Sequence, residues 1–250
     1  MHEEGNDYEP YIQYVKKIHE NEELFLTFRR EPIYMDMMEH VTFIHGAVCL
    51  YQSQIMFCIK DADVEEFCDL NDRYGRPIRF QYSPTLSCSP TSLRYIFHAL
   101  LIINRLKMLN ISEVSFVEVG GGYGGLSLAL QYFGPKENIS IKKYSFVDLQ
   151  PAMQLQKKYL SKHTLSAPVS FYDASHFGKD VEGDNLFFIS CYSFSEIAKD
   201  FQQKYIEFLL PKCKHGFLAW NMIDVYDFGK QASFTDEIPQ TGYTNKFVFF

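Results

Sequence analysis

The sequence feature that most constrains the fold is a run of glycines between an apolar segment and a helical pattern. Residues 117–125 read Val-Glu-Val-Gly-Gly-Gly-Tyr-Gly-Gly, with five glycines in six positions. Because glycine has no Cβ, such a segment can turn tightly and let a ligand approach the backbone. We therefore predict a strand over 115–119, a tight turn, and a helix over 124–133 that Gly134-Pro135 ends.

The rest of the chain divides into two regions with different sequence patterns. From residue 113 onward, short apolar runs alternate with helical patterns, which predicts an α/β fold: a Rossmann-like, mostly parallel sheet with helices on both faces. The further strands are expected at 144–147, 169–172, 186–190, 216–220 and 247–250, and the further helices at 152–160 and 196–210. Residues 1–85 are predicted to form an N-terminal helical region that covers the substrate side, and residues 86–250 the ligand-binding domain.

Composition narrows the possible binding partners and the cellular location of the protein. The formal net charge is −7 and the basic residues are scattered, which disfavours a nucleic-acid substrate. The six cysteines are isolated from one another, so we expect reduced thiols and a cytoplasmic location. The apolar stretch 41–59 contains His45 and Gln52, so we interpret it as a buried protein helix and expect no membrane insertion.

The ligand at the glycine turn is expected to carry a nucleoside. Gly120, Gly122 and Gly125 fit the G-x-G-x-x-G pattern of dinucleotide sites, so NAD has to be considered. Glu118, however, lies inside the predicted strand, and a buried acid needs a partner. The ammonium group of S-adenosylmethionine would supply that partner, whereas NAD offers no cation there. S-adenosylmethionine is therefore the predicted cofactor, and an NAD-binding oxidoreductase is the alternative.

Two acids follow the next predicted strands. Asp148 stands where a carboxylate can accept hydrogen bonds from both ribose hydroxyls, or alternatively cap a helix. Asp173 could meet the adenine amino group or cap a turn.

With these residues in place, the sequence resembles the bacterial and viral sugar O-methyltransferases, a family of class I S-adenosylmethionine-dependent methyltransferases. The resemblance rests on residues 117–125, 144–149, 89–95 and 190–196, and covers roughly residues 80 to 250. Gln150 departs from it, because proline is expected there and Pro151 comes one position late. The resemblance implies a sugar or glycan hydroxyl as the acceptor. The predicted cofactor contacts are Glu118, Gly120, Gly122, Tyr123, Gly124, Asp148, Leu149, Asp173 and Ser190.

A sugar hydroxyl is a poor nucleophile, so a general base is expected near the ends of the first and fourth strands. Glu196 is the preferred base, with an exposed helix acid as the alternative, and His176 is a weaker candidate. The predicted substrate contacts, for which packing or capping are the alternatives, are Tyr192, Ser193 and Asn221. Asp224 and Asp227 are loop acids near the end of the fifth predicted strand, but no compact trio of acids is visible, so we expect no metal. The rival functions are methyl transfer to another small molecule, at oxygen or nitrogen, and a catalytically silent nucleoside-binding scaffold.

Overall fold

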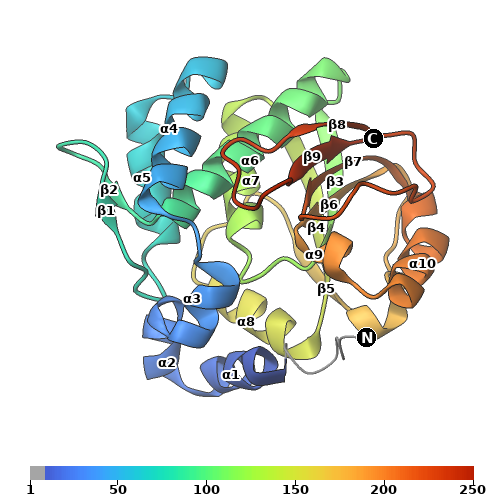
Figure 1. Ribbon diagram of the computed structural model, residues 1–250, viewed down its shortest axis with the longest axis horizontal. Coiled ribbons are helices and arrows are strands. Elements are labelled where there is room, and N and C mark those ends of the chain that lie inside the picture. Colours follow the sequence, from blue (N-terminus) through green and yellow to red (C-terminus); the bar gives the residue numbers. More distant parts are fainter. Residues whose placement is uncertain (1–8) are drawn as a thin grey trace.

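The computed structural model describes residues 9–250 and is built on one seven-stranded sheet, with the strand order β5-β4-β3-β6-β7-β9-β8 (Figure 1). The strands are β3 (Glu113–Val119), β4 (Ser140–Asp148), β5 (Val169–Asp173), β6 (Leu186–Cys191), β7 (Cys213–Trp220), β8 (Ser233–Asp236) and β9 (Lys246–Phe249). The first five are parallel, and β9 runs antiparallel to both of its neighbours. This order is that of the Rossmann-like methyltransferase fold, so the predicted fold class is confirmed.

The two-residue alternation of the strands directs side chains to two cores. Phe116 and Phe146 face one cluster, while the residues that follow them, Val117 and Val147, face the other. Figure 1 shows α6 and α7 on one side of the sheet and α10 on the other. The bounds of these helices are α6 (Pro90–Met108), α7 (Gly125–Lys136), α8 (Gln150–Leu160), α9 (Ser193–Glu196) and α10 (Lys199–Phe208).

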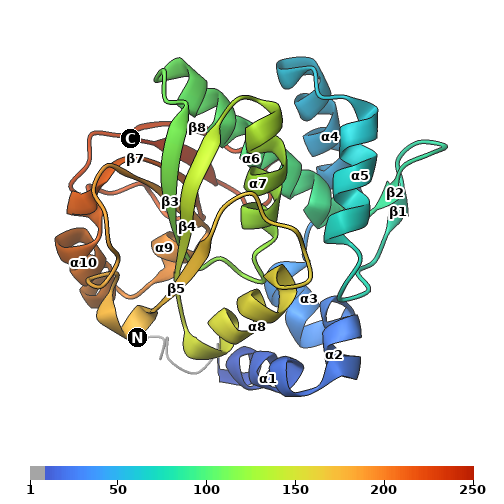
Figure 2. The same ribbon diagram turned by 180° about the vertical axis from the view of Figure 1, so that it is seen from behind.

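The N-terminal helices pack in two places. Figures 1 and 2 show α4 and α5 outside α6 and α7, and α1 to α3 beside α8, at the edge of the sheet where β4 ends. Phe28, Phe67 and Phe116 belong to one core cluster, so both predicted regions share their packing. The bounds are α1 (Glu9–Glu20), α2 (Glu22–Thr27), η1 (Phe28–Arg30), α3 (Pro32–Met38), α4 (Phe43–Phe57) and α5 (Asp61–Asn71), followed by the hairpin β1 (Phe80–Gln81) and β2 (Ser87–Cys88).

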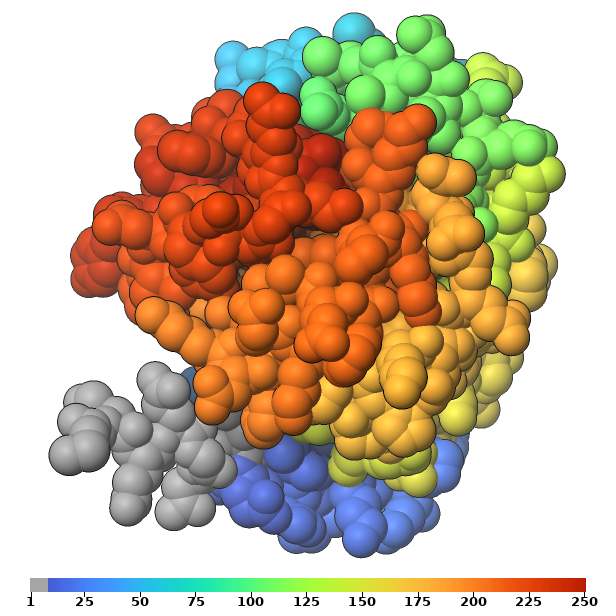
Figure 3. Space-filling model, turned by 90° about the vertical axis from the view of Figure 1, so that its right-hand side faces the viewer, coloured from blue at the N-terminus to red at the C-terminus, as the bar shows by residue number. Residues whose placement is uncertain are grey.

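On the view of Figure 3, the C-terminal part of the chain, orange to red, covers most of the face, with N-terminal helices in blue below it. Part of the red segment is the hairpin of β8 and β9, of which the sequence predicted only the last strand. No helix of the described residues is long and apolar enough to cross a membrane.

Three local predictions are corrected. The helix after the glycine turn does not stop at Gly134-Pro135 but continues to Lys136, because proline in the last turn removes one hydrogen bond only. The helix expected at 196–210 begins later, at Lys199, because Ile197 is extended (ψ 136°) and separates it from the short helix α9, which Glu196 ends. The apolar stretch 41–59 is not wholly buried: on α4, Ile44, Tyr51 and Ile55 are 68%, 59% and 54% exposed.

Candidate cofactor and acceptor site

The glycine turn joins β3 to α7 in a conformation that requires glycine. The φ angles of Gly120, Gly122 and Gly124 are +74°, +55° and +97°, in the left-handed region that other residues rarely adopt. Gly124 stands at the N-cap of α7, so the first N–H groups of that helix follow the turn directly. The predicted strand, turn and helix are therefore present at these positions.

The same glycines allow other segments to pack closely on the turn. A Cβ on Gly120 would lie 2.2 Å from Oγ of Ser193, and one on Gly122 would lie 2.5 Å from Cε of Met38. Ser193 begins α9 and Met38 ends α3, so both the fourth strand's exit and the N-terminal region meet at the turn. Packing within the chain thus accounts for part of the glycine content.

Glu118 is a buried carboxyl group beneath this turn. Its side chain lies on the same face of the sheet as Tyr144, whose hydroxyl donates a 2.8 Å hydrogen bond to Oε2. A Cβ on Gly121 would lie 3.0 Å from that same oxygen. Burial raises the pKa of Glu118 to about 8; the charge of Asp148 adds to this and the Tyr144 hydrogen bond opposes it. Within residues 9–250, no lysine, arginine or histidine forms an ion pair with Glu118.

Asp148, at the end of β4, fastens the turn to the helix that follows. Its Oδ2 accepts hydrogen bonds from the Gly121 N–H (3.0 Å) and from Nε2 of Gln156 (2.7 Å), and its Oδ1 accepts one from the Leu149 N–H. Burial raises its pKa to about 6, against the effect of these bonds. Leu149, not Asp148, is the N-cap of α8, so the capping alternative is wrong. Leu149 itself is 47% exposed at the edge of the turn.

The residues that follow β5 form a surface turn. Asp173 caps the short helix η2 (Ala174–His176) by accepting a hydrogen bond from the Ser175 N–H, which is the capping alternative of the sequence prediction. Hydrogen bonds from Ser175 and Gln150 lower the pKa of Asp173. His176 is exposed and its Nδ1 contacts Asp180. The ring of His176 is thus engaged by Asp180.

The side chains of two predicted cofactor contacts are engaged by the protein. Ser190 donates to the Val119 carbonyl (2.8 Å) and accepts from the Phe194 N–H (3.0 Å), which joins the end of β3 to α9. Tyr123 is fully buried, with its hydroxyl accepting from Nδ2 of Asn71. Any contact of Ser190 or Tyr123 with a ligand is therefore left mainly to the backbone.

The structure brings Glu196 and Asn221 together. Glu196 ends α9 after the fourth parallel strand, and Asn221 follows the fifth. The side-chain amide of Asn221 donates to Oε1 of Glu196, and the Asn221 N–H donates to Oγ of Ser195 at 3.1 Å. The preferred base and a predicted substrate contact thus form one pair, in which Glu196 is exposed and Asn221 is half-buried. Tyr192, before α9, donates its hydroxyl to Glu237, a residue the sequence analysis did not select.

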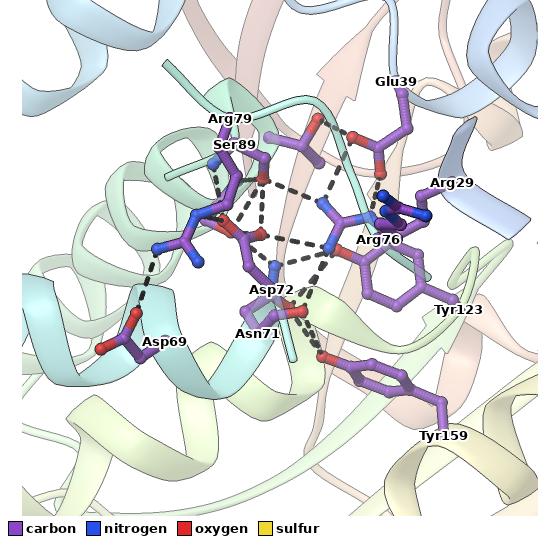
Figure 4. A network of polar contacts seen from close by, with 12 residues as sticks. Arg29, Glu39, Asp69, Asn71, Asp72, Arg76, Arg79, Ser89, Tyr123 and Tyr159 are labelled. Atoms are coloured by element: carbon purple, nitrogen blue, oxygen red, sulfur yellow. Dashed lines mark hydrogen bonds and ion pairs between the residues drawn. The ribbon is translucent and has the colours of Figure 1, made fainter. Parts of the chain in front are cut away.

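A buried polar network, also missed by the sequence analysis, attaches the N-terminal region to the turn (Figure 4). Arg29 is fully buried and pairs with Glu39 and Asp72, while its guanidinium lies 4.8 Å from the ring centroid of Tyr123. Asp72 also accepts hydrogen bonds from the Ser89 hydroxyl and N–H. The residues of this network come from η1, the ends of α3 and α5, the start of α6 and the glycine turn, so the network fixes the surroundings of Tyr123.

Among the residues that the structure describes, no group of three His, Cys, Asp or Glu side chains is placed to hold a metal ion. Asp227, one of the loop acids considered for a metal, accepts the Gly229 N–H at 2.8 Å.

No family model and no curated protein matches the sequence. Several solved structures are similar. A S-adenosylmethionine-dependent methyltransferase from Clostridium acetobutylicum is 16% identical over 68% of this chain and 55% of its own (TM-score 0.39). Magnesium protoporphyrin IX methyltransferase from Synechocystis is 12% identical over 63% of this chain and 82% of its own (TM-score 0.42), and PKMT2 from Rickettsia typhi is 20% identical over 52% and 26% (TM-score 0.38). This chain therefore spans about half of the Clostridium protein and a quarter of the Rickettsia protein. At these TM-scores the likenesses carry no weight for function.

Proposed function

We propose that the protein is an S-adenosylmethionine-dependent methyltransferase. The observation that carries this proposal is Glu118, a buried carboxyl group directly beneath a strand–glycine–helix turn, with no cationic partner among residues 9–250. An unpaired buried carboxyl is costly, and a ligand that brings an ammonium group would compensate for it. S-adenosylmethionine carries such a group on its methionyl part, and NAD has none to place there.

The residues around the turn fit the rest of this cofactor. Oδ1 of Asp148 accepts one hydrogen bond within the protein, so it retains a lone pair for a ribose hydroxyl. The N-terminus of α7 adds N–H groups and positive potential. Asp173 already caps its own turn, and its predicted contact with the adenine amino group would be additional.

S-adenosylmethionine supplies a methyl group on a sulfonium, which is electrophilic without further activation. The chain has to orient the acceptor and receive its proton. Glu196 would accept that proton, and the amide of Asn221 would hold its carboxylate in place. His176 is the reserve candidate.

The proposed acceptor is a hydroxyl of a sugar, in a glycan or nucleotide-sugar, in the cytoplasm. The family resemblance of residues 117–125 and 190–196 supports this choice. Hydroxyl and amide groups that suit a sugar stand at the exits of β6 and β7, on Tyr192, Ser193 and Asn221. Met38 over Gly122 supports a covering role for the N-terminal helices. The rivals are another small-molecule acceptor and a silent nucleoside-binding scaffold.

Calorimetry with S-adenosylhomocysteine and with NAD tests the cofactor. We expect saturable binding of S-adenosylhomocysteine and none of comparable affinity for NAD; a preference for NAD would overturn the proposal. Transfer of labelled methyl groups from S-adenosylmethionine to a panel of free sugars, nucleotide-sugars and glycans tests the acceptor. Cofactor binding without transfer to any member of the panel would favour the scaffold.

A further inference from the structure

Arg94 is a buried cation whose hydrogen-bonding capacity is largely unused. It lies in the second turn of α6 and is 5% exposed. Its Nη2 reaches the Met38 carbonyl at 3.4 Å, at the limit of a hydrogen bond, and its Nη1 is buried without a partner among residues 9–250. No carboxylate of that part of the chain lies within ion-pair distance of Arg94.

Arg29 shows how a buried arginine with a structural role is paired in this protein. Arg29, also buried, contacts two carboxylates, a backbone carbonyl and a serine hydroxyl. Leaving a buried guanidinium unpaired is costly in general, so an arginine with a purely structural role is expected to resemble Arg29. Arg94 does not.

Two acids border Arg94, Glu39 through its charge and Glu237 through Tyr192, and both are engaged by other groups. Glu39 pairs with Arg29 and accepts a hydrogen bond from Thr91. Glu237 accepts hydrogen bonds from the Tyr192 hydroxyl and from Thr241. The guanidinium instead lies over the ring of Tyr192, with Cζ 5.4 Å from its centroid.

Arg94 borders the glycine turn through the two residues that cover it. The Met38 carbonyl accepts its hydrogen bond, and the Met38 methyl group lies over Gly122. Tyr192, beneath its guanidinium, directly precedes Ser193, whose hydroxyl lies over Gly120. Arg94 therefore contacts the backbone of Met38 and the residue before Ser193, and the side chains of Met38 and Ser193 are the ones that lie over the turn.

We propose that Arg94 binds the oxyanion, a carboxylate or phosphate, of a ligand seated at the glycine turn. A guanidinium with free N–H donors matches the paired oxygens of such a group. The proposal rests on the proposed function for the identity of its two sources: the methionyl carboxylate of the methyl donor, or an acidic group of the acceptor. Arg94 is then a binding residue that recognises charge in one of the two substrates.

The test compares wild type with Arg94→Met and Arg94→Lys, and with Arg105→Met as a control at the other end of α6. The probes are S-adenosylhomocysteine, 5′-methylthioadenosine, which lacks the methionyl carboxylate, and inorganic phosphate added to the protein with and without S-adenosylhomocysteine. Calorimetry gives affinities, and thermal denaturation gives Tm. Arg94→Met should leave Tm unchanged or higher, because an unpaired buried charge is replaced by an apolar side chain.

If the donor supplies the oxyanion, Arg94→Met should lower the affinity for S-adenosylhomocysteine roughly tenfold or more and leave the affinity for 5′-methylthioadenosine unchanged. If the acceptor supplies it, S-adenosylhomocysteine affinity stays the same, and phosphate should raise the Tm of wild type and of Arg105→Met but not of Arg94→Met. Arg94→Lys should give intermediate effects, and it carries the test if Arg94→Met does not fold.

Unchanged affinity together with an unchanged phosphate effect in the Arg94 variants would overturn the proposal. So would a large fall in Tm of Arg94→Met with binding intact, because that result assigns Arg94 to the packing alone. Failure of wild type to bind S-adenosylhomocysteine would count against the proposed function, whereas the phosphate comparison still decides the role of Arg94.

Discussion

Protonation of Glu118 should control cofactor affinity. With a pKa of about 8, only about one Glu118 in eleven is ionised at pH 7 in the ligand-free protein. An ammonium group binds the ionised form, so the ligand has to displace the proton at a cost of about 1.4 kcal/mol at pH 7. Binding of S-adenosylhomocysteine should therefore strengthen as the pH rises.

The size of the effect follows from the same pKa. Between pH 6.5 and pH 8, the ionised fraction rises roughly fifteenfold, and the association constant should rise by about the same factor. At pH 7 the protein should release about 0.9 proton for each ligand bound, which calorimetry in two buffers of different ionisation enthalpy can count. Glu118→Gln should bind more weakly and lose this pH dependence, because its amide does not titrate.

Glu113→Gln, at the exposed start of the same strand, is the matched control and should keep the wild-type profile. Equal pH profiles for wild type and Glu118→Gln would refute the reasoning. Stability offers a second check. The folded pKa of Glu118 is above its unfolded value, so its protonated form stabilises the ligand-free protein at acidic pH and this contribution is lost as the pH rises toward 8. Urea unfolding of Glu118→Gln should lack that loss.

Three further outcomes are expected. Asp148→Ala should weaken the binding of S-adenosylhomocysteine by roughly 1–3 kcal/mol in calorimetry, while the circular dichroism spectrum stays native. Unchanged affinity would limit the role of Asp148 to its hydrogen bonds with the turn. Glu196→Gln should slow methyl transfer by about 10²–10⁴ at unchanged cofactor affinity, whereas Glu207→Gln, an exposed acid of α10, should not; a normal rate in Glu196→Gln would reject it as the base. Transfer should persist in excess chelator, and a loss that magnesium restores would bring Asp224 or Asp227 into the site.

Local patterns in the sequence predicted the parallel strands and the glycine turn. Short apolar runs and closely spaced glycines can be recognised from residues that are adjacent in the sequence. These patterns failed for β8, whose four residues are all exposed and show no apolar alternation, and for the two-residue strands β1 and β2. They also failed to predict the break at Ile197, where the chain leaves one helix and enters another without proline or glycine.

Asp148, Glu196 and Asn221 were selected as candidates because they follow predicted strands, and Glu118 because it lies inside one; their roles stay predictions. The buried arginines were not selected, because nothing next to Arg29 in the sequence shows that it pairs with Asp72, which is 43 residues away. Arg94 lies between apolar residues of α6, and its unfilled hydrogen-bonding capacity becomes visible only when the distant segments around it are in place.

The Arg29 network has a consequence for how the molecule comes apart. Its bonds join the N-terminal helices to Tyr123 and, through Asn71, to Tyr159 of α8. Removal of those helices would leave the buried hydroxyls of Tyr123 and Tyr159 without their hydrogen-bond partner Asn71. The N-terminal region and the sheet therefore form one cooperative unit, which should melt in a single transition and share slow amide hydrogen exchange.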